Sequence, residues 1–111
     1  MTETRAKYHA RPTVEQGVRF DSEAEARRYR ELRLLEYAGE ITGLVMQPRY
    51  ELTVNREKVG EYVADFRYTE KDQLVVEDVK GIRTGVSYRL FKLKARLMHA
   101  LYGIEVREVT A

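Results

Sequence analysis

The sequence predicts one α/β domain with a mixed β-sheet of four to five strands flanked by α-helices. Two segments with apolar residues at helical spacing, one early and one late, enclose four segments that alternate as strands do. The length of 111 residues, of which 43% are hydrophobic and 34% charged, is that of one compact domain. No cysteine occurs, which excludes a disulfide framework and thiolate metal sites.

Residues 1–19 are polar and show little periodicity, which predicts a mobile basic arm in front of the fold. The arm carries Lys7, His9 and Arg11 ahead of Pro12. Such an arm can lie on DNA phosphates, and a disordered tail without a partner is an equally good interpretation. We treat these three basic residues as candidate DNA-binding residues.

A capping box predicts where the first helix begins, because Ser22 is followed three residues later by Glu25. Tyr29, Leu32 and Leu35 are apolar at helical spacing and predict the buried face. Gly39 is the expected stop of a helix that runs to about residue 37.

The strand segments that follow the first helix are 41–45, 50–54, 61–68 and 74–80. Polar turns separate them, so the first three strands form a meander. Segment 61–68 is predicted to place Tyr62, Ala64 and Phe66 on one face and Asp65 on the other. Segment 74–80 has apolar residues on both faces, which is typical of a central strand.

The second helix is predicted over residues 87–102, ends at Gly103 and precedes a last strand over 104–109. One of its faces carries leucines at helical spacing, which we expect to be buried. These leucines are Leu90, Leu93, Leu97 and Leu101.

A basic stripe lies beside these leucines, because Arg89, Lys92 and Arg96 occupy positions i, i+3 and i+7. The net charge of +2 is small, but no acidic residue occurs in 79–104. We therefore expect the stripe to contact DNA phosphates, with a solvated charged face as the alternative. Lys94 lies nearer the leucines and either snorkels to solvent or reaches toward the site.

Two acids and a lysine have a spacing that suits metal-dependent chemistry. Asp65 precedes Asp78 by thirteen residues, and neighbouring antiparallel strands, about 4.8 Å apart, bring such positions side by side. Asp78 and Lys80 share a face, whereas Glu77 points away unless a bulge shifts the strand by one residue. Two carboxylates can share a hard divalent cation, and a nearby lysine can orient the attacking water, which predicts phosphodiester hydrolysis.

Asp65 and the triplet Asp78-Val79-Lys80 resemble the signature of the PD-(D/E)xK nuclease superfamily, an acid at the end of one strand and a D/E-x-K triplet on the next. Ala64 stands where the superfamily's name has proline. Glu25 matches the glutamate that this superfamily commonly carries on its first helix. Over 7–109, the chain is similar to small phage-borne proteins of the superfamily that resemble Holliday junction resolvases.

The resemblance implies a restriction-endonuclease-like core and a homodimer that places two sites against a four-way DNA junction. It implies that Glu25, Asp65, Asp78 and Lys80 are the catalytic residues. The implied cofactor is Mg²⁺, with Mn²⁺ as a substitute, held by the three acids and the Val79 carbonyl. The implied product carries a 5′-phosphate.

Arg83 and Thr84 lie between two glycines after the central strand and are expected to grip the DNA backbone beside the cut. The alternatives to a junction resolvase are a nuclease for flaps, nicks or recognition sites, and a non-catalytic DNA-binding accessory module. No apolar run approaches the roughly 20 residues that cross a bilayer, and no signal-peptide core is present. We therefore expect a cytoplasmic protein, in the host cytoplasm if a phage encodes it.

Overall fold

The computed structural model describes residues 13–15 and 17–111. Its main sheet has four strands in the order β3-β6-β7-β8, which are Thr42–Met46, Phe66–Glu70, Gln73–Lys80 and Val106–Thr110. β7 pairs with β6 antiparallel and with β8 parallel, so the sheet is mixed. The predicted α/β class, mixed sheet and central strand are confirmed.

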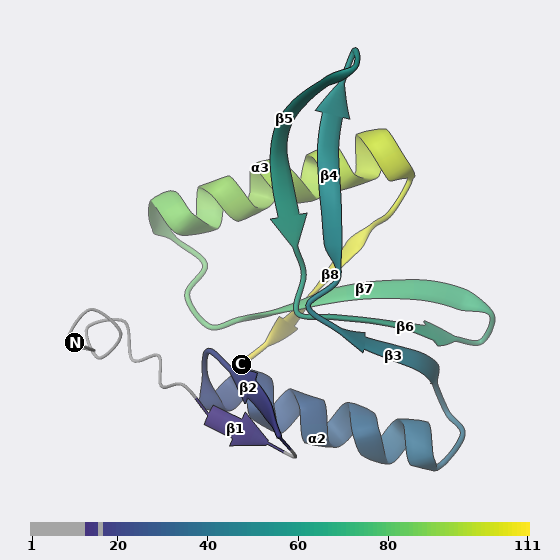
Figure 1. Ribbon diagram of the computed structural model, residues 1–111. Helices are drawn as coiled ribbons and strands as arrows, with labels where there is room; N and C mark the ends of the chain where they lie inside the picture. The colour runs from purple at the N-terminus through teal and green to yellow at the C-terminus, as the bar shows by residue number, and fades with distance from the viewer. Residues whose placement is uncertain (1–12, 16) are drawn as a thin grey trace.

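Two helices, α2 (Glu23–Tyr37) and α3 (Gly85–Tyr102), cover opposite faces of this sheet (Figure 1). Consecutive side chains of β7 point toward different helices, because Val75 belongs to the core cluster of α2 and Val76 to that of α3. In the described part of the chain, neither helix is long and apolar enough to span a membrane.

The first turn of α2 has the predicted capping box. Ser22 is the N-cap, and the Glu25 backbone N–H donates to its Oγ at 3.2 Å. The Ser22 hydroxyl donates in turn to Glu25 Oε2 at 3.3 Å. At the other end, Gly39 has a left-handed φ of 81°, which ends the helix as predicted.

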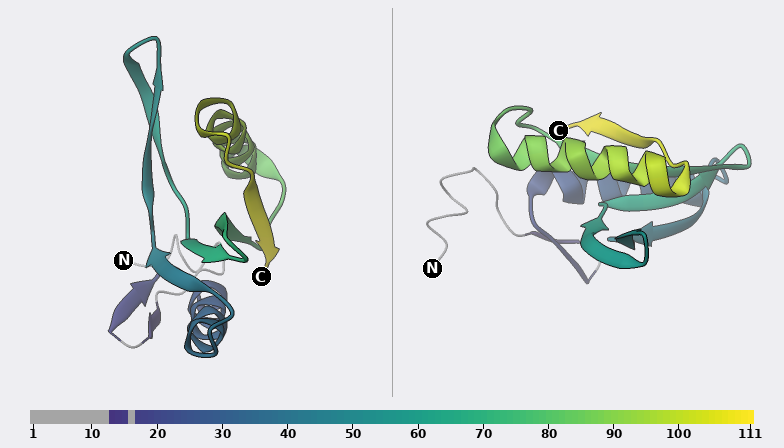
Figure 2. Two further views of the ribbon diagram at one scale, coloured as in Figure 1. Left: turned by 90° about the vertical axis from the view of Figure 1, so that its right-hand side faces the viewer. Right: turned by 90° about the horizontal axis from the view of Figure 1, so that it is seen from above.

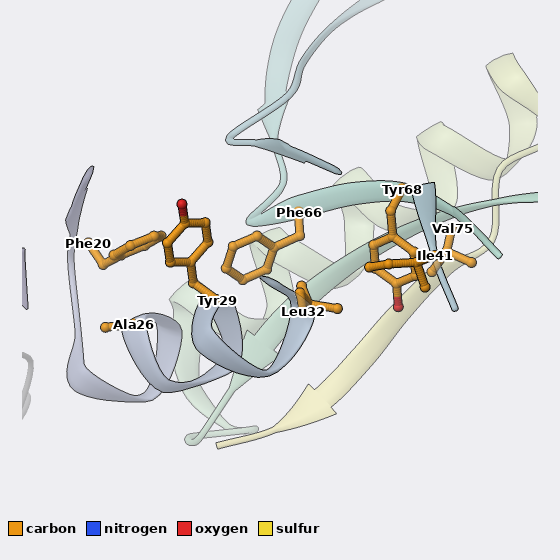
Figure 3. Close-up of a cluster of buried hydrophobic side chains, with 8 residues drawn as sticks. All are labelled: Phe20, Ala26, Tyr29, Leu32, Ile41, Phe66, Tyr68 and Val75. Atoms are coloured by element: carbon orange, nitrogen blue, oxygen red, sulfur yellow. The ribbon is translucent and has the colours of Figure 1, made fainter. Parts of the chain in front are cut away.

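Aromatic side chains pack α2 against the sheet (Figure 3). The Tyr29 ring stacks on Phe66, with centroids 6.4 Å apart, and Phe20 lies 5.0 Å from Tyr29. Leu32 and Ile41 are also buried in this cluster. The packing fixes the first turn of α2, and therefore Glu25, relative to the start of β6.

A long hairpin stands away from the main sheet (Figure 2). Its strands are β4 (Arg49–Val54) and β5 (Glu57–Val63), which pair antiparallel. The base of the hairpin packs on α3, where Leu52 and Tyr62 join Phe91. The hairpin therefore forms one wall beside α3.

The predicted strand 61–68 is wrong, because the chain bends at Ala64 and Asp65 between β5 and β6. Tyr62 and Ala64 lie in the α3 cluster, whereas Phe66 lies in the α2 cluster. The bend moves the chain from the hairpin into the main sheet and interrupts the alternation of faces. Asp65 occupies this corner.

The segment predicted as an arm also differs. β1 (Thr13–Glu15) and β2 (Val18–Phe20) form a small antiparallel pair in front of α2. Short strands joined by two residues have too few positions for a periodic pattern to stand out. Lys7, His9 and Arg11 lie outside the described residues.

The prediction of a buried leucine face on α3 is wrong. Leu90, Leu93 and Leu101 are exposed and Leu97 is half-buried, whereas Phe91 and Met98 face the sheet. The helix has two apolar faces, and the Phe91 ring, which contacts the Tyr62 ring, lies on the one that packs.

Candidate active site

Four predicted site residues from three places in the fold line one hollow. Glu25 lies on the first turn of α2, Asp65 at the bend after β5, and Asp78 and Lys80 on β7. The hollow has a volume of about 610 Å³ and is called the carboxylate hollow below. The structure thus brings together the residues that the sequence analysis grouped.

Three hydrogen bonds hold Asp65 in place. Its backbone N–H donates to the Glu77 carbonyl at 3.2 Å, and its carbonyl accepts from the Gln47 N–H at 2.9 Å. Its carboxylate Oδ2 accepts from the Val79 N–H at 2.7 Å. The corner between two sheets is therefore rigidly positioned beside β7.

The three carboxyl groups are neighbours. The charges of Asp78 and Glu25 act on Asp65, and the charge of Asp78 also acts on Glu25. Burial, together with the charges of Asp78 and Glu25, raises the pKa of Asp65 to about 9. Burial and the charge of Asp21 also raise the pKa of Glu25, against the hydrogen bond from Ser22. Such a cluster favours binding a proton or a cation.

Tyr62 is a partner of the cluster that the sequence analysis did not assign. Its hydroxyl donates a buried hydrogen bond to Asp78 Oδ2. Burial and the Asp78 charge raise the pKa of Tyr62 well above its usual value. The phenol therefore stays a hydrogen-bond donor and fixes one oxygen of Asp78.

Lys80 lies at the edge of the hollow. Its ammonium is 4.0 Å from the centroid of the Phe91 ring, a cation–π contact. Among the described residues, no salt bridge connects Lys80 with an acid, so a structural Asp65–Lys80 pair is not formed. Lys94 lines the same hollow from α3.

Glu77 lies on the opposite face of β7. Its carboxylate accepts from the Arg28 guanidinium at 2.7 and 3.1 Å and from the Tyr68 hydroxyl at 2.6 Å. The hydrogen bonds to Glu77 raise the pKa of Arg28. β7 keeps an unbroken register with both neighbours, so no bulge brings Glu77 into the carboxylate hollow.

A second hollow adjoins the cluster, with a volume of about 450 Å³. It shares Glu25 and Asp65 with the carboxylate hollow and continues toward Arg19 and Gln47. The acids therefore lie between two hollows. The sequence analysis did not single out Arg19 or Gln47.

Gln47 has a left-handed backbone with φ 54°. The other non-glycine residues with positive φ, Asn55, Arg56, Lys71 and Asp72, lie in hairpin turns, where the conformation is expected. Gln47 lies instead in the connection between β3 and β4, where a glycine would be less strained. The neighbouring Pro48 gave no signal of this, because proline favours an extended backbone in the residue before it.

Most predicted DNA-binding residues lie away from the acids. Arg83 and Lys92 each form a salt bridge with Glu108 of β8 at 3.1 Å, and Thr84 is the N-cap of α3. Arg89 and Arg96 are exposed on α3 and line neither hollow beside the acids. Of the predicted DNA-binding residues that the structure describes, Lys94 lines the carboxylate hollow.

Whether the carboxylate hollow suits a metal ion depends on the ligand atoms that its side chains offer. Within the described ranges, no three His, Cys, Asp or Glu side chains form a ready-made metal site. The chemistry of the hollow nevertheless suits a hard divalent ion, because Glu25, Asp65 and Asp78 offer only oxygen atoms. Val79 lines the hollow between Asp78 and Lys80. We conclude that the oxygen atoms of these residues are of the kind that binds Mg²⁺.

The family described as "Protein of unknown function (DUF1064)" matches residues 5–109. The chain belongs to this family. No curated protein and no solved structure matches the chain. The family region includes every element from α2 to β7, so both hollows and the acid cluster lie within it.

Proposed function

We propose that this DUF1064 protein is a metal-dependent endonuclease that hydrolyses phosphodiester bonds in branched DNA. The observation that carries the proposal is the convergence of Glu25, Asp65 and Asp78 in one hollow. In the part of the chain that the structure describes, none of the three forms a salt bridge with a lysine or arginine. Buried acids without a cationic partner are costly and require a function.

Asp65 and Asp78 would hold Mg²⁺ or Mn²⁺, with Glu25 and the Val79 carbonyl completing the set. When bound, the ion neutralises charge on a phosphate and polarises water. The hydrogen bonds from Tyr62 to Asp78 and from Val79 to Asp65 occupy one oxygen of each carboxylate. They orient the acids before substrate arrives, which reduces reorganisation during the reaction.

Two ammonium groups supply the positive charge that DNA requires in the hollow. In this proposal Lys80, held beside the Phe91 ring, orients the attacking water. Lys94 lines the wall formed by α3 and is suited to a phosphate contact. Both roles fit a hollow in which the acids alone would repel a polyanion.

The two hollows on either side of the acids favour internal cleavage. A strand that passes Asp65 can continue into the second hollow toward Arg19 and Gln47. An exonuclease site ends at the scissile bond, whereas this arrangement leaves room beyond it. The resemblance to phage-type Holliday junction resolvases supports a four-way junction as the substrate and a homodimer as the active form.

The test is a cleavage assay on a synthetic four-way junction, with and without Mg²⁺. We expect the junction to be cut only when Mg²⁺ is present. Asp78→Asn should lower the cleavage rate by at least about 100-fold and retain junction binding. Asp72→Asn, an identical change in an exposed hairpin turn, is the matched control and should keep full activity.

Competition with flaps, nicks and linear duplex assigns the DNA form. Preferential cutting of one of these would replace the junction as substrate while retaining the nuclease. Junction binding without any Mg²⁺-dependent cleavage would contradict the proposal and support an accessory DNA-binding module.

A further inference from the structure

The ammonium of Lys80 lies over an aromatic ring and not against an acid. Its Nζ is 4.0 Å from the centroid of the Phe91 ring, which reaches the carboxylate hollow from α3. The three acids of the cluster line the same hollow, yet Lys80 forms no salt bridge with any residue that the structure describes. A lysine beside unpaired acids gains energy by pairing with one of them, so its place on the ring needs a physical reason.

The Phe91 ring is held firmly in its position. It is 6% exposed, and its centroid lies 6.4 Å from the ring centroid of Tyr62 and 5.9 Å from that of Tyr88. Tyr62 belongs to the hairpin and Tyr88 to α3, so contacts from two elements fix the ring. A fixed ring presents the negative face of its π system to a cation at a constant place.

The position of Lys80 decides how the acids can be used. Lys80 and Asp78 are two residues apart on β7, so their side chains leave the sheet on the same face. The ammonium stands on a flexible four-carbon stem, which allows it to turn toward the ring or toward the acids. A lysine that pairs with an acid occupies a carboxylate oxygen and supplies the charge that a divalent cation would otherwise supply. The ion would then have to displace the lysine.

We propose that Phe91 is a positioning residue of the candidate site, which holds the Lys80 ammonium away from the acids and so keeps their oxygen atoms open to a divalent cation. The ring competes with the acids for the ammonium without occupying any oxygen atom of the hollow. The lysine remains charged and beside the place of the substrate. This role depends on the metal site of the proposed function and not on the form of the DNA substrate.

A role of Phe91 in packing alone gives a different expectation. Phe91 shares a core cluster with Leu52, Val76 and Met98. If the ring only filled this core, a smaller apolar side chain would lower stability and leave the lysine and the acids unaffected. The two roles therefore differ in what happens to Lys80 when the ring is removed.

The first experiment locates the ammonium in the full chain, without metal or DNA. The lysines are dimethylated with isotope-labelled methyl groups, which keeps their charge, and the methyl resonances are assigned by substitution. In the wild-type chain we expect the Lys80 methyl protons to be shifted upfield, because they lie over the face of a ring. Phe91→Leu should remove this shift, and Lys94, which lines the same hollow, is the internal reference.

The second experiment measures Mg²⁺ affinity from the rise of the unfolding temperature with ion concentration. Phe91→Leu should lower the affinity by about tenfold, the lower end of the effect of residues that orient metal sites. Lys80→Met should restore the affinity in the Phe91→Leu chain and have a smaller effect in the wild-type chain. Circular dichroism confirms that each variant is folded.

Met98→Val is the matched control for the core. It shortens a fully buried side chain of the same cluster, and Met98 lines neither hollow beside the acids. The Met98→Val chain should lose stability but keep the wild-type Mg²⁺ affinity and the upfield Lys80 resonance.

A wild-type Lys80 resonance without the upfield shift would overturn the proposal, even if Phe91→Leu did not fold. Unchanged Mg²⁺ affinity in Phe91→Leu would also overturn it, as would a loss that Lys80→Met does not restore. Absence of Mg²⁺ binding in the wild-type chain would contradict the proposed metal site together with this role. Restored affinity without DNA cleavage would retain the role of Phe91 and reject the nuclease, so the two proposals are distinguishable.

Discussion

Glu77 and Asp78 are adjacent acids on β7, buried on opposite faces of the same sheet. Toward α2, Glu77 meets the Arg28 guanidinium and the Tyr68 hydroxyl, so its charge has a complete set of partners. Toward α3, Asp78 meets the Tyr62 hydroxyl and another acid, Asp65. One strand therefore carries one neutralised acid and one that is not.

The difference shows how a fold separates a charge with an ionic partner from a charge without one. A buried carboxylate with a bidentate arginine is stable in the folded chain but is not available to a ligand. A carboxylate among other acids remains destabilising until a proton or cation arrives. Strand parity alone creates this separation, because consecutive side chains face opposite sides.

Neutralising Glu77 and Asp78 one at a time should show the largest difference between the two acids. Glu77→Gln should lower the free energy of unfolding by about 2 to 3 kcal/mol, because Arg28 loses its buried ionic partner and retains the more exposed Glu31. Asp78→Asn should leave it unchanged or raise it, since a repulsive charge is removed. Urea unfolding in a chelator measures both, with the exposed Glu57→Gln as control. Equal losses in the two variants would remove the distinction.

Metal should stabilise the face that carries Asp78. At 100 times the dissociation constant, Mg²⁺ should stabilise the wild-type chain by about 2.7 kcal/mol because it binds only the folded state. Asp78→Asn should show little of this gain, and Glu77→Gln, although less stable, should retain it. Thermal unfolding at one protein concentration gives the comparison, and an equal gain in Asp78→Asn would contradict the assigned ligand.

The stability of the folded chain should also depend on pH through Asp65. The pKa of Asp65 is about 9 in the folded chain and near 3.9 in an unfolded one, so the folded state holds the proton more tightly. The stabilisation of the folded state by this proton is complete below about pH 4 and is lost as pH rises toward 9. In a chelator, we expect a fall of about 1 to 2 kcal/mol across this window, because water entering the open hollow limits the penalty.

Asp65→Asn should flatten that pH profile, since the amide does not titrate. Urea midpoints at several pH values provide the measurement. A wild-type chain that becomes more stable as pH rises from 5 to 8 would show that the acids are not destabilised by one another.

The last prediction concerns Gln47, which lines the second hollow. Gln47→Gly should raise the free energy of unfolding by about 0.5 kcal/mol, because glycine adopts the left-handed backbone without strain. The greater freedom of glycine in the unfolded chain offsets part of this gain. If the amide contacts DNA, the same variant should bind the junction a few-fold more weakly. Fluorescence anisotropy with labelled junction tests this, and unchanged binding would assign Gln47 a purely structural role.

Local signals predicted much of the fold. The capping box at Ser22 and Glu25 needs only neighbouring residues, and the alternation along β7 is a property of one strand. The grouping of Asp65, Asp78 and Lys80 depended on one short turn between β6 and β7. Each of these features is set by contacts close in sequence.

The features that could not be predicted depend on distant packing. α3 has two apolar faces, and the packing of Phe91 and Met98 against the hairpin and the sheet decides which one is buried. The bend at Asp65 interrupts a pattern that reads as continuous alternation. Gln47 joins the site only because its N–H pairs with the Asp65 carbonyl across two segments.

The bend at Asp65 has a consequence for how this family can diversify. Hydrogen bonds to Gln47, Glu77 and Val79 anchor that corner independently of the hairpin's far end. Residues could therefore be added or deleted in pairs around the Asn55 and Arg56 turn, keeping each side chain on its face, without displacing the carboxylate. Variation in hairpin length would then change what the protein reaches, while the chemistry at its base stays constant.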